Sequence, residues 1–292
     1  MNNFQQGILE PVPQLARYLF FSVVPESDTC AALSTIKELV DGQSVVVGFG
    51  ESLTLAVKKE IPGLVPFPHY VGEGIDVPST PCALWFWLKG NDRGMLLHKT
   101  REIEKALMDT FELDNVIDAF QYGPGLDLTG YEDGTENPDG DDAVDAAIVQ
   151  NTVGLDGSSF VAVQQWVHNL DRFQFMSQQD QDNTIGRRIS DNEEIDDAPE
   201  SAHVKRTAQE DFDPAAFVVR RSMPWADTNH EGLVFVAFGK NFDAFDALLR
   251  RMVGFDDGIT DALFNFTRPI TGSYFWCPPM RDGQLDLSAL DL

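Results

Sequence analysis

The chain of 292 residues carries 47 acidic and 21 basic side chains, a net charge of −26, and 43% of its residues are hydrophobic. This composition supports a large buried core, and the negative charge disfavours nucleic acid and anionic membrane surfaces as partners. Its three cysteines form no CxxC pair, which argues against disulfides and favours the cytoplasm. No apolar stretch approaches the roughly 20 residues of a membrane helix, so a membrane protein is not expected.

The first half predicts six elements in the order β-α-β-β-α-β. Strands are expected over 16–24, 44–50, 81–90 and 115–123, and helices over 28–42 and 93–111. Asp28 and Gly42 suit the two caps of the first helix. The order is that of a ferredoxin-like unit, in which helices cover one face of an antiparallel sheet.

The second half predicts a comparable order. Extended segments are expected over 158–170, 203–207, 217–223 and 232–239, and helices over 171–189 and 241–254. Two such units in tandem predict an α+β, duplicated ferredoxin-like fold, with antiparallel sheets and helices packed on their faces. We expect one domain at 1–125 and a second at 126–292, with the join in an acidic, glycine-rich stretch at 124–158. The alternative is an α+β protein without an internal repeat.

Common catalytic motifs are missing from the sequence. GFGESL at 48–53 begins like a dinucleotide-binding loop, but Leu53 stands where the third glycine belongs, so a turn after a strand explains it better. No P-loop, HExxH, GxSxG or EF-hand pattern occurs. The five histidines are too dispersed for a local zinc motif. A metal site with a single histidine is still compatible with the sequence, and haem is the cofactor for which one axial histidine suffices.

Three segments stand out together: GYEDGTENP at 130–138, SAHVKR at 201–206 and RRSMP at 220–224. With IGRRI at 185–189 and RMVGFDDGITDALFNFTRPITGSYFW at 251–276, they resemble the dye-decolorising peroxidases over nearly the whole chain. These are haem enzymes with a duplicated ferredoxin-like fold, and the short bacterial branch, class B, is the most similar. GxxDG alone is a weak signal, whereas its continuation TENP and the spaced histidine and arginine segments make the resemblance specific.

The resemblance implies a peroxidase with haem b (iron protoporphyrin IX) in the C-terminal half. Such an enzyme moves a proton between the two oxygens of hydrogen peroxide while the O–O bond breaks, which requires a base and a cation. Asp133 is the expected base and Arg220 the expected cation. Taken alone, the first is typical of a turn and the second of a solvated ion pair. Burial would raise the pKa of Asp133 and Arg220 would lower it, and we expect an acidic pH optimum.

His203 is the axial iron ligand that the resemblance implies. The acid that accepts a hydrogen bond from its other ring nitrogen is expected to be Asp261, with the following acids as open alternatives: Asp211, Asp213, Asp257 and Glu210. Arg187 is expected at a haem propionate, with Arg188 as the alternative. Gly134, like Gly130, would let the backbone approach the porphyrin. Further cofactor contacts are expected from Thr135, Asn137, Ser222, Leu233 and Phe235.

Hydrogen peroxide and a reducing substrate of unknown identity are the expected partners. The resemblance also implies a homodimer or a larger ring. Some relatives dock into a protein nanocompartment shell, but the tail DGQLDLSALDL is short and lacks an extended linker, so a shell partner has weak support. Two other functions stay open: a haem-handling protein without peroxide turnover, and a module without haem that binds a partner through its acidic surface.

Overall fold

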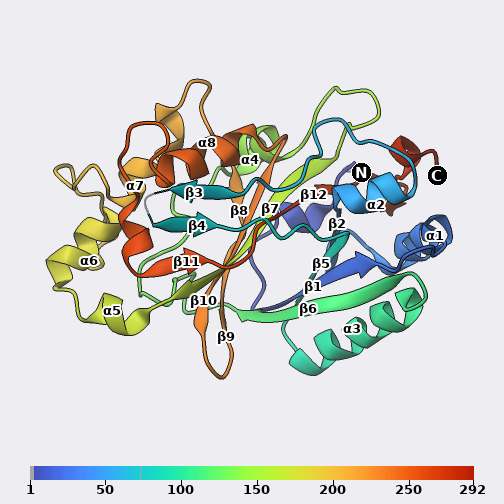
Figure 1. Cartoon of the computed structure of the whole chain (residues 1–292), viewed down its shortest axis with the longest axis horizontal. Helices are drawn as coiled ribbons and strands as arrows, with labels where there is room; N and C mark the ends of the chain where they lie inside the picture. Colours follow the sequence, from blue (N-terminus) through green and yellow to red (C-terminus); the bar gives the residue numbers. More distant parts are fainter. Residues whose placement is uncertain (1–2, 73) are drawn as a thin grey trace.

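The computed structural model describes residues 3–72 and 74–292 (Figure 1). The N-terminal half contains one four-stranded antiparallel sheet in the order β2-β5-β1-β6, with α1 and α3 packed on it. Its elements are β1 (Leu15–Val23), α1 (Thr29–Leu39), β2 (Val45–Phe49), β5 (Leu84–Gly90), α3 (Arg93–Leu107) and β6 (Phe111–Phe120). Asp28 caps α1 as predicted, accepting a hydrogen bond from the Ala31 amide (3.0 Å).

The C-terminal half contains a second sheet with the same topology, in the order β12-β7-β10-β9. Its elements are β7 (Ser159–His168), β9 (Met223–Ala226), β10 (Glu231–Gly239), α8 (Asp243–Met252) and β12 (Ser273–Cys277). Numbered within each half, both sheets have the strand order 4-1-3-2 of the ferredoxin-like fold. The prediction of a duplicated ferredoxin-like α+β fold is therefore confirmed.

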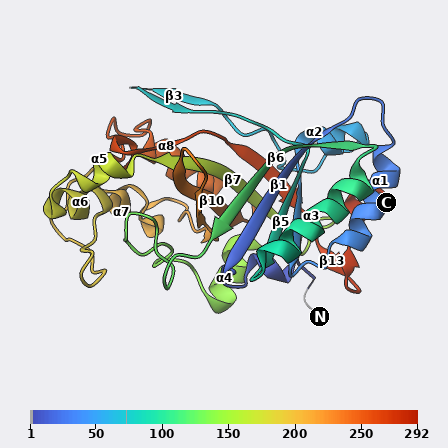
Figure 2. The same ribbon diagram turned by 90° about the horizontal axis from the view of Figure 1, so that it is seen from below.

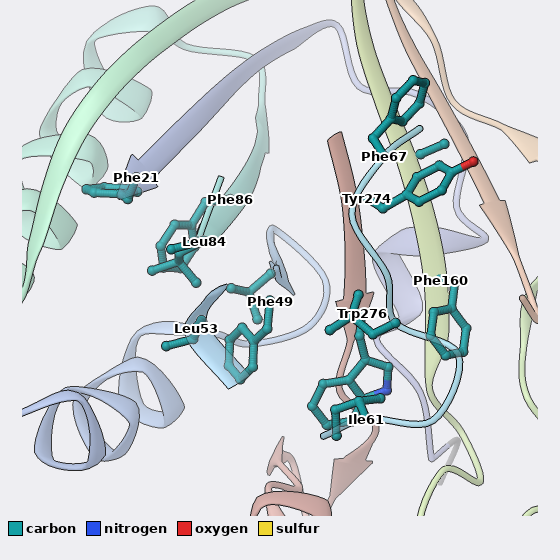
Figure 3. Packing of buried hydrophobic residues seen from close by; sticks show 14 of the residues in the cluster. Phe21, Phe49, Leu53, Ile61, Phe67, Leu84, Phe86, Phe160, Tyr274 and Trp276 are labelled. Atoms are coloured by element: carbon teal, nitrogen blue, oxygen red, sulfur yellow. The ribbon is translucent and has the colours of Figure 1, made fainter. Parts of the chain in front are cut away.

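The two sheets join at both edges. β12 pairs with β2 at Trp276 and Phe49, and β6 pairs with β9 at Ala119 and Trp225. Because β7 also pairs with β10, eight strands form a closed ring. One apolar cluster, which includes Tyr18, fills its inside, and a second lies between the strands and the helices. Figure 3 shows that the second cluster crosses the join, where Phe49 and Trp276 meet at 6.0 Å between ring centroids.

A hairpin of the N-terminal half reaches over the C-terminal half. It consists of β3 (Tyr70–Gly72) and β4 (Ile75–Val77) and extends toward α8 (Figures 1 and 2). The Tyr70 hydroxyl donates to the Asp246 carboxylate of α8, and the Tyr70 ring lies 5.5 Å from the Phe255 ring. The two halves are thus packed together, and a domain boundary at residue 125 stays a prediction.

Several local predictions are wrong. The helix expected over 171–189 is two short helices, α5 (Leu170–Gln174) and α6 (Gln178–Ile185). Ser177 breaks the run, because its hydroxyl accepts from the Asp180 amide (3.2 Å) and starts a new helix. Gly186, with a φ of 95°, ends α6 before the arginines. Gly42 lies beyond the end of α1, whose C-cap is Val40.

The extended segment predicted at 203–207 is a single helical turn, α7 (His203–Arg206). The Arg206 amide donates to the Ala202 carbonyl (3.0 Å), and the Thr207 hydroxyl donates to the His203 carbonyl (2.8 Å). One turn is too short to show helical periodicity in a sequence. The segment 217–223, which was also predicted to be extended, is interrupted between the end of β8 (Val219–Arg220) and the start of β9 at Met223.

The remaining elements are short. They are α2 (Glu51–Ala56), α4 (Gly140–Ala147), β11 (Thr267–Pro269), β13 (Met280–Arg281), β14 (Gln284–Leu285) and the 3₁₀ turns η1 (Gln6–Ile8), η2 (Gln209–Asp211), η3 (Ala262–Asn265) and η4 (Ser288–Leu290). Within the described part of the chain, no helix combines the length and the apolar character needed to cross a membrane.

Candidate active site

Asp133 and Arg220 lie where three cavities meet. One cavity, of about 100 Å³, is mostly apolar and also contains His203. The second, of about 250 Å³, is polar and also borders His203, and the third, of about 180 Å³, opens beside residues 121–126. A larger cavity of about 670 Å³ is lined by residues 135–138, among others, but by none of these three side chains. The acid, the arginine and the histidine that the sequence singled out are therefore brought together.

The apolar cavity lies between the C-terminal sheet and the helices. Five side chains that line the cavity lie on one face of the sheet. Arg220 of β8 pairs with Ala237 of β10, and alternate residues along β10 and β7 have their side chains on the same face. This face carries Arg220, Leu233, Phe235, Gln164 and Trp166. The opposite wall is formed by His203 of α7, by Leu263 of η3 and by Phe245, Leu248, Leu249 and Met252 of α8. Leu233 and Phe235 are thus walls of this cavity, and their contact with a cofactor stays a prediction.

His203 is held by a buried carboxylate. Its Nδ1 lies 2.7 Å from Oδ2 of Asp261, whose side chain is fully buried, whereas the His203 side chain is 24% exposed. The other Asp261 oxygen accepts from the Leu263 amide (2.8 Å) at the start of η3. With Nδ1 as the donor, Nε2 keeps its lone pair for a metal. Among the open alternatives, Asp257 instead accepts from Arg206 at 2.7 and 2.8 Å.

The loop that carries Asp133 is shaped by glycines and backbone hydrogen bonds. Gly130 and Gly134 have φ angles of 91° and 79°, which strongly favour glycine. The Asp133 amide donates to the Gly125 carbonyl (3.0 Å). Burial raises the pKa of the Asp133 carboxyl, although Arg220 opposes the rise. The carboxyl is thereby suited to take up and release a proton at a higher pH than an exposed aspartate.

Asn137 fixes the backbone of Arg220. Its side-chain oxygen accepts from the Arg220 amide (2.7 Å), and its amide nitrogen donates to the Arg220 carbonyl (3.1 Å). Asn137 thus joins the Asp133 loop to β8, and its expected contact with the cofactor stays a prediction. Ser222 borders the third cavity, and its hydroxyl accepts from the Val236 amide (3.3 Å).

Arg187 borders the polar cavity but is already paired. Its guanidinium donates to Glu136 (2.7 Å), Glu194 (2.5 Å) and the Asn192 carbonyl (2.8 Å). Thr135 borders the same cavity, and its hydroxyl accepts from the Asn192 side chain (3.0 Å). Arg188 instead points to Asp191 and Glu193 and does not border this cavity.

His168 and Asp127, which the sequence analysis missed, anchor the Asp133 loop. His168 Nε2 lies 3.0 Å from Asp127 Oδ2, and its Nδ1 lies 2.6 Å from the Thr267 hydroxyl. The Asp127 carboxylate also accepts from the amide (2.8 Å) and hydroxyl (2.6 Å) of Thr129. Burial raises the pKa of Asp127, but the hydrogen bonds from His168 and Thr129 outweigh it, and the net pKa is lowered. The pair thus ties the loop to the end of β7.

Removing this anchor should destabilise the protein. We expect Asp127→Ala to lower the free energy of unfolding by about 1–3 kcal/mol, because it leaves buried donors of His168 and Thr129 without a partner. Asp139→Ala is the matched control, since Asp139 is exposed and its side chain caps nothing in α4. Urea unfolding of both variants measures the difference. Equal midpoints for the two variants would contradict the assigned anchor.

Comparisons with known proteins identify the family. A family model described as "Dyp-type peroxidase, C-terminal" matches residues 125–282, more than half of the chain. A dye-decolorizing peroxidase of Mycobacterium tuberculosis is 28% identical, over 94% of this chain and 88% of its own length. One from Mycolicibacterium paratuberculosis is 30% identical, over 69% of this chain and 59% of its own. A solved variant of DypB from Rhodococcus jostii RHA1, described as in complex with heme, is 26% identical with a TM-score of 0.85, and covers 95% of this chain and 96% of its own.

The fold and the site define a duplicated ferredoxin-like protein in which an aspartate and an arginine face a carboxylate-bound histidine across an apolar cavity. The chain belongs to the Dyp-type peroxidase family.

Proposed function

We propose that this protein is a haem peroxidase that reduces hydrogen peroxide and oxidises a dye or another one-electron donor. The observation that carries the proposal is the placement of His203, supported by Asp261, opposite Asp133 and Arg220 in one cavity. The solved relative described as in complex with heme supports the choice of cofactor.

The residues around the cavity fit haem b. The walls are largely aliphatic and aromatic, as a porphyrin requires, and His203 would supply the ligand to its iron. Two buried side-chain nitrogens that border the cavity, Gln164 Nε2 and Trp166 Nε1, have no hydrogen-bond partner among the described residues. Both nitrogens could donate hydrogen bonds to polar atoms of a molecule bound in the cavity. The polar cavity beside Arg187 would receive the propionates, and Arg187 would exchange a carboxylate partner for one of them.

When bound, haem supplies an iron that accepts electrons from the donor and passes them to peroxide. The protein supplies the proton chemistry. Asp133 takes a proton from one peroxide oxygen and delivers it to the other, and Arg220 stabilises the negative charge that develops as the O–O bond breaks. Asp261 holds His203 in the tautomer whose Nε2 can bind iron. The third cavity, beside residues 121–126, offers peroxide a route to Asp133.

The base form of Asp133 sets the acidic limb of the pH profile. Burial raises its folded-state pKa, so the reaction with peroxide is lost as the pH falls through that raised value. The predicted pH optimum of dye oxidation stays on the acidic side of neutrality. A rate with peroxide that does not fall as the pH is lowered through the ordinary range of an aspartate would contradict Asp133 as the proton carrier.

A haem titration tests the cofactor. Adding haemin to the purified protein should produce a Soret band with one equivalent, and His203→Ala should shift that band and weaken binding, because the iron loses its imidazole. His230→Ala is the control, since His230 is exposed in the turn between β9 and β10. A wild-type protein without a Soret band would overturn the proposal and favour a module that uses its acidic surface. Haem binding without any reaction with peroxide would favour the haem-handling alternative.

The assignments of domains and assembly are also proposals. We propose domains at 1–125 and 126–292, a cytoplasmic homo-oligomer, and docking into a protein shell as the less supported option. Size-exclusion chromatography with light scattering measures the oligomeric state directly, and a monomer would contradict the proposed homo-oligomer.

A further inference from the structure

Gln164 has an unusual environment in the middle of β7. Its side chain is 1% exposed and points into the cavity from the sheet, among Trp166, Leu233 and Phe235. Its amide nitrogen has no partner within residues 3–72 and 74–292. Burying an amide without a hydrogen bond costs free energy, so a glutamine at this position needs a compensating interaction.

A second glutamine at this cavity, Gln209, does have hydrogen-bond partners for its side chain. It borders the same cavity and is also buried. Its nitrogen donates to the Glu136 carbonyl (3.0 Å), and its oxygen accepts from the Val218 amide (2.9 Å). Gln209 therefore has a structural role in the protein wall. Gln164, by contrast, lines the cavity with a donor that has no partner among the described residues.

The register places Gln164 on the same side as the proposed catalytic groups. Arg220 of β8 pairs with Ala237 of β10, which in turn pairs with Ala162 of β7. Gln164 is the next residue of β7 whose side chain lies on the same face of the sheet. His203 reaches the cavity from the helices, on the opposite wall. A ligand that approaches the iron opposite His203 meets the wall that carries Gln164. Gln164 does not border the polar cavity, which is the one proposed to receive the propionates.

We infer that Gln164 is a further catalytic residue, which donates a hydrogen bond to hydrogen peroxide on the side of the haem opposite His203. It supplements Arg220 by fixing the orientation of the peroxide beside Asp133, and it transfers no proton itself. This inference rests on the proposed haem site. It predicts that any small anion or oxygen ligand of the ferric protein is stabilised by the Gln164 amide.

Fluoride binding to the ferric holoprotein provides the test. Fluoride accepts hydrogen bonds, and its binding is read from the visible spectrum. Gln164→Met keeps the length of the side chain but removes the donor, and we expect fluoride affinity and the rate with peroxide each to fall about tenfold, the effect of one lost hydrogen bond. Gln164→Leu should show the same loss and serves as a second variant should the first fail to fold.

The neighbouring residue is the matched control. Gln165 is also buried in β7 but faces the other side of the sheet, so Gln165→Met should leave fluoride affinity unchanged. Unchanged affinity in Gln164→Met, or an equal loss in Gln165→Met, overturns the inference. So does a loss of haem affinity in Gln164→Met, since the amide would then serve the porphyrin. A missing Soret band in the wild-type protein would instead defeat the proposed function.

Discussion

Replacing Asp133 by asparagine is expected to slow the reaction with hydrogen peroxide by about 10²–10⁴-fold, the usual contribution of a general base. The substitution keeps the size of the side chain and the backbone hydrogen bond from Asp133 to Gly125. It removes a carboxyl whose pKa burial has raised, and an amide cannot accept and return a proton in its place. Stopped-flow recording of the Soret band after mixing with peroxide measures the rate.

Two comparisons separate chemistry from folding in this experiment. Haem affinity should stay at the wild-type value in Asp133→Asn, because Asp133 holds no part of the cofactor in the proposed site. Asp139→Asn, in the same loop but exposed, should react at the wild-type rate. A rate within threefold of the wild type for Asp133→Asn would remove this residue from the proton path.

The sequence predicted the fold because its strands and long helices are strongly periodic. The strand of 16–24 became β1 and the helix of 241–254 became α8, each within a few residues of its predicted ends. The short turn at His203 could not be predicted in the same way, because four residues contain too little periodicity. The hydrogen bonds of the turn are local, such as the one from the Arg206 amide to the Ala202 carbonyl (3.0 Å). A distant segment adds a contact just before the turn, where the Ala262 amide donates to the Ser201 carbonyl (2.8 Å).

The site was predictable in its residue types but less so in its contacts. The resemblance suggested Asp261 as the partner of His203, and the structure joins them across 58 positions of sequence. Spacing alone could not distinguish Asp261 from Asp257 in a chain with 47 acidic side chains. The excess of acidic side chains also explains why Arg187, which was expected to bind a haem propionate, forms ion pairs with Glu136 and Glu194.

Gln164 did have a sequence signal. It is a polar residue at a cavity-facing position of SFVAVQQWVH, whose residues are buried almost throughout. The neighbouring Gln165 obscured this signal, because the two glutamines in sequence resemble a polar break. His168 and Asp127 had no comparable signal, since 41 residues separate them.

Replacing Arg220 by leucine is expected to change both the rate and its pH dependence. The rate with peroxide at its plateau should fall by about 10²–10³-fold, the usual cost of removing a group that stabilises developing charge. Arg220 also lowers the pKa of Asp133 against the effect of burial, so its removal raises that pKa further. Because Asp133 acts in its ionised form, the acidic limb of the profile should move to higher pH.

Arg220→Lys distinguishes the charge from the shape of the guanidinium. Both variants keep the backbone bonds from Asn137 to position 220, so the loop and β8 should remain joined. A lysine keeps a positive charge near Asp133, and the acidic limb should therefore stay close to that of the wild type. The plateau rate should recover only in part, because a single ammonium cannot present the paired donors of a guanidinium. If Arg220→Leu left the acidic limb in place, Asp133 and Arg220 would not be electrostatically coupled, and the acid limb would have to belong to another group.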